Sequence, residues 1–467
     1  MELIDCSVNE ILRRLDRGAV RCADLAEQCV ARTDLEADLN CYVAFDADGL
    51  LRQAREADAR RRSGERLALL GVPIALKDNI QALGFPCGNG TAALHGQHPR
   101  VDAGLVQRLR AAGAIITGKL GMHELAFGIT NNNAVNGPVR NPWDPLRIPG
   151  GSSGGSGAAV AAGLVSAAIG TDTGGSVRVP AALCGVAGLR PTVGRVSGAG
   201  IAPISTSRDT AGPLARCVAD LALLDSVLSG DSRPLPDVGL RGLRLGVPRG
   251  HFWEDLEPGV EALAEVALEA LARAGVTLVP VELPGIAALD EEVSFVVALY
   301  EFARDMRAYL REQGGAVGYE QLVAGICSPD VKALAPALDG EGAVPEAAYR
   351  AALQARERLR SLYADTFATN DVAALVFPTT PCTAARIGDD ETFLHNGRAC
   401  PTFGTFIRNT DPASNAALPG LSLPMGLSAG LPAGLALDGP AGSDRLLLAI
   451  GAAVEAVLPP APRPPSS

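Results

Sequence analysis

Two short segments combine serine with glycine in a way that could support nucleophilic chemistry. The segment GGSSGGSG at 150–157 contains only these two residue types, and GTDTGGS at 170–176 ends in Ser176, 24 residues after Ser152. A serine hydroxyl becomes a good nucleophile only when a neighbouring group removes its proton. A glycine-rich turn can point successive backbone N–H groups at one spot, as the stabilisation of an oxyanion requires. The pair of segments therefore indicates acyl transfer.

Two other readings of the first segment are weaker. A flexible linker is disfavoured because the segment lies between Pro149 and an Ala/Val run typical of a buried helix. A phosphate-binding loop is disfavoured because no GK[ST] ending and no GxGxxG in register after a strand is present. We therefore expect a rigid loop that presents hydroxyl groups.

These segments, with a third around Lys77, resemble the motifs of the amidase signature family. The resemblance extends from GVPIALKDNI at 71–80 to SDRLLLAIGAAVE at 443–455, nearly the whole chain. It implies that Ser176 is the nucleophile, Ser152 a bridging serine in a cis peptide, and Lys77 the base. The predicted activity is serine-dependent amide hydrolysis without metal or other cofactor.

The chemistry of the segments fits these roles. The apolar run Val72–Leu76 precedes Lys77, and burial of this kind lowers the pKa of a lysine so that it can act as a base. The backbone N–H groups of Thr173, Gly174, Gly175 and Ser176 are the expected oxyanion hole.

Neighbouring residues have predicted supporting roles. Ser153 is expected to support the loop, and Ser156 to cap a helix. Asp172 and Arg178 flank the nucleophile and are predicted to form a structural ion pair, with a substrate carboxylate as the alternative partner of Arg178. His123 is expected in a pocket wall or a structural position, and Cys184 as a packed thiol. The chain departs from the family pattern at Ala417, where glycine is usual, and at Arg190, where lysine is commoner; neither departure puts the activity in doubt.

The alternation of apolar runs and helical patterns predicts α/β layers with a mixed sheet. Expected helices include 7–15, 22–33, 50–62, 104–113, 258–274, 289–312, 346–368 and 443–457. Expected strands include 69–78, 114–120, 243–248, 276–283, 373–381 and a late hairpin at 421–440. The resemblance implies a three-layer α/β/α architecture. We expect an N-terminal helical segment at 1–65, a catalytic domain at 66–458 with an inserted helical cap near 285–370, and a Pro-rich tail at 459–467.

Composition limits the partners. The formal net charge is −11, with no Lys/Arg run that could override it locally, so neither nucleic acid nor an anionic membrane is expected to bind. Ten cysteines and five histidines are dispersed without metal-ligand spacing, which favours reduced thiols and no metal site. A cytoplasmic protein is expected. Because family members are often dimers, the resemblance leaves a homodimer open.

Segments 203–225 and 407–427 are most similar to the indoleacetamide and mandelamide hydrolases within the family. This similarity implies a small aryl-acetamide substrate, with Met122, Phe127 and Ile129 as an apolar wall for its ring. Alternative functions are the glutaminase subunit of a tRNA-dependent amidotransferase and a ureide- or carboxybiuret-type amidohydrolase. A catalytically inactive binding protein is disfavoured because Lys77, Ser152 and Ser176 are all present.

Overall fold

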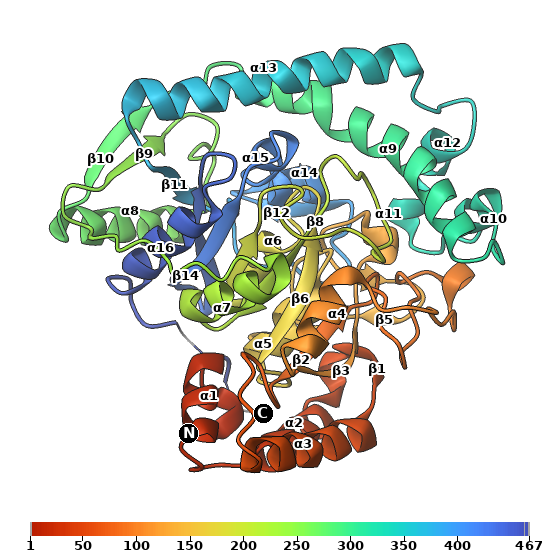
Figure 1. The fold of residues 1–467 in the computed structure, drawn as a ribbon. Coiled ribbons are helices and arrows are strands. Elements are labelled where there is room, and N and C mark those ends of the chain that lie inside the picture. Colours follow the sequence, from red (N-terminus) through yellow and green to blue (C-terminus); the bar gives the residue numbers. More distant parts are fainter. Residues whose placement is uncertain (1, 462, 466–467) are drawn as a thin grey trace.

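The computed structural model describes residues 2–461 and 463–465, so part of the predicted Pro-rich tail lies outside the described residues. The chain folds into three layers, with helices on both faces of one large mixed sheet (Figure 1). This architecture confirms the predicted α/β/α fold class.

The sheet has eleven strands, and consecutive strands of the chain are often not neighbours. In spatial order they are β1 (Tyr42–Phe45), β3 (Ile115–Leu120), β2 (Pro73–Lys77), β6 (Ala167–Asp172), β8 (Thr210–Ala215), β7 (Ala187–Arg190), β14 (Gly420–Ser428), β15 (Leu431–Asp438), β11 (Ala374–Pro378), β9 (Arg244–Pro248) and β10 (Thr277–Val281). Strand β2 runs parallel to both β3 and β6, and β9 is parallel to both β10 and β11. The other pairs are antiparallel.

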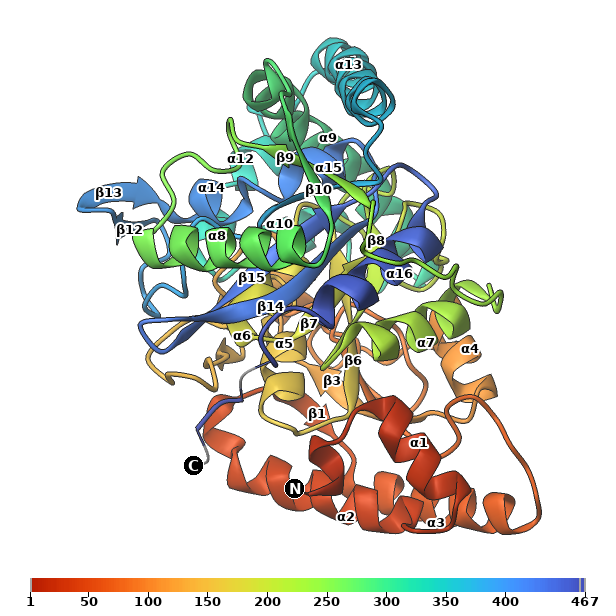
Figure 2. The same ribbon diagram turned by 90° about the vertical axis from the view of Figure 1, so that its left-hand side faces the viewer.

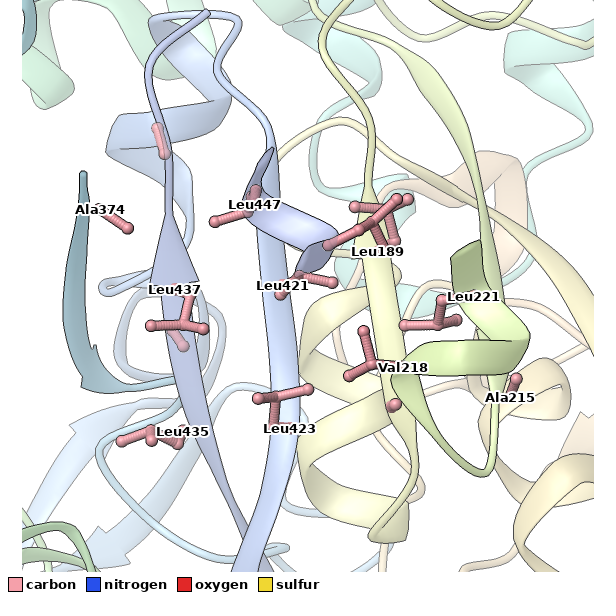
Figure 3. Packing of buried hydrophobic residues seen from close by; sticks show 14 of the residues in the cluster. Leu189, Ala215, Val218, Leu221, Ala374, Leu421, Leu423, Leu435, Leu437 and Leu447 are labelled. Atoms are coloured by element: carbon pink, nitrogen blue, oxygen red, sulfur yellow. The ribbon is translucent and has the colours of Figure 1, made fainter. Parts of the chain in front are cut away.

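One face of the sheet holds the main apolar core. Leu189, Leu421 and Leu437 on adjacent strands pack against Val218 and Leu447 on the covering helices (Figure 3). The helices of this face are α4 (Gly104–Ala111), α7 (Val218–Ser229), α8 (Pro258–Arg273) and α16 (Asp444–Glu455). Figure 2 shows α7, α8 and α16 in front of the strands.

The opposite face is covered at its centre by two short helices, α5 (Gly154–Ala161) and α6 (Arg178–Cys184). Side chains alternate between the two faces along each strand. In β6, Ala167 and Ile169 belong to the main core whereas Ala168 packs with α5 and α6. In β2, Ala75 packs on that second side, and alternation places Lys77 there too. Lys77 is thus directed toward the glycine-serine loop that precedes α5.

The N-terminal segment is mostly helical but also contributes a strand to the sheet. It contains α1 (Val8–Asp16), α2 (Cys22–Leu35) and α3 (Ala47–Arg62), and α1 is capped as predicted by the Ser7 side chain, which accepts from the Glu10 N–H. Strand β1 lies between α2 and α3 and pairs with β3 at the edge of the sheet. The predicted helical segment at 1–65 thus also contains one short strand, which the sequence did not indicate.

Between β10 and β11 the chain is entirely helical, in the range predicted for a cap. The helices are α9 (Ile286–Glu312), α10 (Tyr319–Ala324), α11 (Pro329–Lys332), α12 (Ala335–Leu338) and α13 (Glu346–Asn370). Helices α9 and α13 pack along each other beyond one end of the sheet (Figure 1). Two small hairpins, β4–β5 (Asn132–Asn133, Gly137–Pro138) and β12–β13 (Thr392–His395, Arg398–Pro401), and the short helices α14 (Thr402–Ile407) and α15 (Asp411–Asn415) complete the described elements.

Candidate active site

Three segments far apart in the sequence meet at the carboxyl ends of β2 and β6. Leu76 of β2 pairs with Ile169 of β6 in parallel register, so Lys77 lies beside the residues that enter the turn at 173–176. Carboxyl ends of parallel strands meet at one edge of a sheet, a frequent location for binding sites in α/β proteins. The glycine-serine loop before α5 closes the third side.

Lys77 is completely buried, and its nearest polar partners are neutral hydroxyl groups. Its Nζ donates to Ser152 Oγ at 2.7 Å and to Thr171 Oγ1 at 2.8 Å. Burial lowers the pKa of Lys77 to about 7, because the charges of Asp172 and Asp209 only partly offset the loss of hydration. A lysine with this pKa is substantially neutral near pH 7 and can accept a proton.

Ser152 and Ser153 have different surroundings. The Gly151–Ser152 peptide is cis, and Ser152 is the serine in contact with Lys77. The Ser153 hydroxyl instead donates to the Thr171 carbonyl and accepts from the Thr171 N–H, and the Ser153 N–H donates to the Ser176 carbonyl at 3.2 Å. Ser153 therefore joins the loop to the end of β6.

The turn at 173–176 leaves its backbone donors free. Within the described residues, the N–H groups of Thr173, Gly174, Gly175 and Ser176 donate to no protein acceptor. A Cβ at Gly174 would lie 2.5 Å from Asp411 Oδ1, and one at Gly175 would lie 2.1 Å from Thr410 Oγ1, so only glycine fits there. Several backbone donors without a protein acceptor therefore lie next to Ser176 in the chain, and an oxyanion hole requires donors of this kind.

Behind this turn lies a buried cluster of charges. Arg178 donates to both carboxylate oxygens of Asp172, from Nε and from Nη2, at 3.1 Å each, and Arg190 Nη1 donates to the same carboxylate at 2.9 Å. Burial opposes ionisation of Asp172, but Arg178 and Arg190 together hold its pKa well below the usual range. Since Arg178 is only 1% exposed and also donates to Ser414 Oγ, it has no surface left for a substrate carboxylate.

The two departures from the family pattern have visible environments. Arg190 is fully buried, and beyond Asp172 its guanidinium donates to the carbonyls of Arg208 and Leu418. Ala417 has a φ of +65°, in the left-handed region where glycine is favoured.

An apolar cavity opens beside Ser176. Phe127, Ile129, Phe295, Phe403 and Ile407 line it, Arg208, Ser294 and Asp411 add polar groups to its wall, and the empty space, which includes open solvent, is about 430 Å³. Phe295 and Phe403 lie at a ring-centroid distance of 5.4 Å. Sequence reasoning missed both of these rings, because their helices α9 and α14 are far from the motifs.

Met122 does not line this cavity. It is 1% exposed and packs with Leu94 and Phe302 in a hydrophobic cluster that also contains Phe127. Between Met122 and Phe127 the backbone reverses, with φ of +52° at Leu125 and +62° at Ala126. Phe127 reaches the cavity from this cluster and Met122 does not, which a linear apolar run does not reveal.

Three further predicted residues can be placed. His123 is fully buried, with Nδ1 accepting from the Asn131 N–H at 3.1 Å and Nε2 2.9 Å from Asp330 Oδ2, so it is structural. Cys184 is buried and its thiol donates to the Pro149 carbonyl. Ser156 is not a helix cap, because α5 begins at Gly154 and the residue lies inside the first turn.

Thr171 is the polar neighbour that sequence reasoning did not single out. Its hydroxyl accepts from both Lys77 Nζ and Asn79 Nδ2, at 2.8 and 3.1 Å. The signal was present, since Thr171 is part of the GTDTGGS motif at the end of a predicted strand.

The described part of the chain shows neither a metal-ligand cluster nor a membrane-spanning helix. No group of three or more His, Cys, Asp or Glu side chains is arranged to hold a metal ion among residues 2–461 and 463–465. Across the same residues, every helix is too short or too polar to cross a membrane.

Comparison with known proteins agrees with this geometry. The family model described as Amidase matches residues 24–448. The chain is 44% identical to an indoleacetamide hydrolase of Rhizobium radiobacter, with 96% of each sequence covered. It is 42% identical to a mandelamide hydrolase of Pseudomonas putida, covering 95% of this chain and 89% of that protein. A solved structure titled as an amidase superposes with a TM-score of 0.87 at 34% identity, covering 97% of this chain and all of the other. The chain therefore belongs to the amidase signature family and is an amide-hydrolysing enzyme.

Proposed function

We propose that this enzyme hydrolyses a small aryl-acetamide-type carboxamide to the carboxylic acid and ammonia through an acyl-enzyme on Ser176. The single observation that carries the proposal is the contact of a neutralisable Lys77 with Ser152 Oγ at 2.7 Å, beside a turn whose N–H groups are free. This arrangement provides a base, a hydroxyl that can pass a proton, and donors for an oxyanion.

In the proposed reaction, neutral Lys77 takes the Ser152 proton while Ser152 takes that of Ser176. The Ser176 oxygen attacks the amide carbon, and the carbonyl oxygen becomes an anion held by the N–H groups of 173–176. The C–N bond then breaks, and the nitrogen leaves as ammonia with the proton returned through Ser152. Water attacks the ester in the same way and releases the acid.

The acyl group is assigned to the cavity beside Ser176. Phe127, Ile129, Phe295 and Phe403 supply apolar and aromatic surface, which favours an aryl ring over a polar side chain. The indoleacetamide and mandelamide hydrolases named above share this substrate class by their names. This apolar lining is also the reason to prefer an aryl amide over glutamine, and hence over a glutaminase subunit.

Covalent trapping tests the nucleophile. The purified chain is treated with a fluorophosphonate, its intact mass is measured, and the labelled peptide is mapped. We expect one label on Ser176, and none after Ser176→Ala. A label on the peptide that contains Ser152 and Ser153, with Ser176 unmodified, would exchange the two roles.

Turnover by the isolated chain tests the substrate class. Phenylacetamide, indole-3-acetamide and glutamine are compared without ATP or any partner subunit. We expect the aryl amides to be hydrolysed at least 100-fold more efficiently than glutamine. Faster release of ammonia from glutamine would favour the amidotransferase subunit instead.

A further inference from the structure

A second cavity lies next to the apolar one, and the turn at 173–176 begins at their common border. It holds about 710 Å³ of empty space open to solvent, and Thr171, Thr173, Asn79 and Asp209 are among its lining residues. Thr173, Ala126 and Ile204 border both cavities. The two spaces therefore meet at the residue where the turn begins, and the acyl group needs only one of them.

The position of the base indicates what the second cavity faces. Thr171 lines this cavity and not the apolar one, and its hydroxyl is hydrogen-bonded to Lys77 Nζ. A substrate carbonyl at Ser176 has two substituents, and its leaving nitrogen must face the groups that return a proton to it. With the acyl group in the apolar cavity, the nitrogen substituent is directed to the side of Lys77, where the second cavity opens.

Asp209 places a carboxylate in the wall of this cavity. One carboxylate oxygen accepts from Thr173 Oγ1 at 2.6 Å, and the other accepts from the N–H groups of Ile204 and Ser205. No Lys, Arg or His of the described chain lies within ion-pair distance of it. The neighbouring Arg208 is committed to Asp411 at 2.6 Å. Asp209 is partly exposed toward the cavity, so a cation there would find a carboxylate without a countercharge.

We propose that the second cavity is an amine subsite, in which Asp209 attracts a positively charged group on the leaving amine. The enzyme then cleaves secondary amides of small primary amines as well as primary amides. The inference rests on the proposed function. In the step that uses the subsite, the bond from the amide carbon to Ser176 Oγ forms and the C–N bond breaks. The nitrogen takes the proton held by Ser152 and Lys77, and the amine leaves.

The ratio of kcat/KM for two substrates tests the role of the Asp209 charge. N-(2-aminoethyl)phenylacetamide carries an ammonium group on its leaving amine, and N-(2-hydroxyethyl)phenylacetamide is a neutral match of nearly the same size. We expect kcat/KM to favour the charged substrate about tenfold, equivalent to about 1.4 kcal/mol. Asp209→Asn should bring this ratio close to one. Because the ratio cancels any loss common to both substrates, a shift of the Thr173 turn does not mimic the result.

Filling the second cavity with a large side chain tests whether the substituent on the leaving nitrogen occupies it. Gly198 lines the cavity at its exposed rim, and a Cβ there meets nothing within 4 Å. Gly198→Phe should lower kcat/KM for both N-substituted amides at least tenfold relative to phenylacetamide. Gly239→Phe is the matched control, since Gly239 is also exposed with nothing within 4 Å of a Cβ but lies outside the cavity.

The outcomes separate this inference from the proposed function. If the wild type hydrolyses phenylacetamide and labels at Ser176 but cleaves neither secondary amide, the amine subsite is wrong and the proposed function stands. An unchanged charge ratio in Asp209→Asn, or an equal loss on primary and secondary amides in Gly198→Phe, also overturns the subsite. Failure of the wild type on every amide, without a label, would overturn the proposed function instead.

Discussion

Lys77 and Lys119 are both fully buried at the ends of neighbouring parallel strands, yet their surroundings differ in one respect. Lys119 Nζ lies 3.6 Å from the Asp78 carboxylate and donates to the carbonyls of Asp78 and Pro86. Among the described residues, Lys77 Nζ has two hydroxyl groups and no carboxylate within hydrogen-bond distance. One lysine is held by a countercharge, and the other is desolvated without one.

The difference supports the proposed role of Lys77 as the base. Burial disfavours the charged form of a lysine, whereas an adjacent carboxylate favours it. For Lys77 the nearest acids, Asp172 and Asp209, act from a distance, and Asp172 is already paired with two arginines. A buried lysine without a direct ion pair has a lowered pKa, and its neutral form can accept a proton. Substitution of either lysine tests this difference.

The largest expected effect is the loss of activity on removing the lysine without a countercharge. Lys77→Met should lower kcat/KM at pH 7 by about 10³-fold or more, because neither serine then has a base. Amide hydrolysis by the purified variant measures this, and the loss should be smaller at alkaline pH. A near-normal rate at pH 7 would place the base elsewhere.

The same variant should not be less stable, because a desolvated amine is replaced by an apolar group of similar length. The pKa of Lys77 is about 7 in the folded chain, below its value of 10.5 when exposed. Between these values the unfolded chain binds more protons, so wild-type stability rises with pH there. Urea unfolding at pH 7 and pH 10 should show that Lys77→Met lacks this rise.

Removing Lys119 should have the opposite effects, with a large loss of stability and a small loss of activity. Lys119→Met leaves the buried Asp78 carboxylate without its cation, and breaking such a pair costs about 3–5 kcal/mol. Urea denaturation measures the loss. At temperatures where the variant stays folded, we expect its kcat/KM to fall less than tenfold. A large activity loss in a stable Lys119→Met protein would contradict the division of roles.

The pH profile offers a smaller and more specific test. With neutral Lys77 as the proposed base, kcat/KM should rise about tenfold per pH unit below pH 7 and level off above it. Thr171→Asp places a carboxylate beside Lys77 and makes its environment similar to that of Lys119. This change should move the rising limb upward by about 1–3 pH units. A limb that stays in place would show that another group is titrating.

The motifs were sufficient to predict that the segments of Lys77, Ser152 and Ser176 lie next to one another. Lys77, Ser152 and Ser176 lie in segments whose glycines serve close packing, as at Gly151, where a Cβ would lie 2.9 Å from the Ile129 backbone. Strands β2 and β6 were predictable because both are continuous buried runs. The type of fold follows from their alternation with helices.

Other features depend on contacts that a linear pattern does not encode. The four-residue strand β1 is only half-buried and lies between helices, so neither its length nor its apolarity marks it. Strand β8 contains Gly212 and Pro213, which weaken a strand pattern. The environment of Lys77 depends on Thr171, 94 residues away, and on the absence of a carboxylate in the same place. Absence of a partner can be seen only in the assembled fold.

The smallest expected effect is a change of stability alone, with the pKa of Lys77 unchanged. Ala417 has a φ of +65°, and a left-handed backbone costs a residue with a side chain about 1–2 kcal/mol. Ala417→Gly removes this cost but adds about 0.4–1 kcal/mol of chain entropy to the unfolded state. We therefore expect a net gain of about 0.5 kcal/mol in the free energy of unfolding, measured by urea titration. The pH profile of kcat/KM should remain that of the wild type, because the substitution alters no contact of Lys77 or Lys119. Ala417→Ser, which keeps the left-handed position occupied by a side chain, is the control and should give no such gain. A shifted pH profile in Ala417→Gly would mean that the turn at Ala417 influences the charges around Lys77 and that stability and basicity are not independent here.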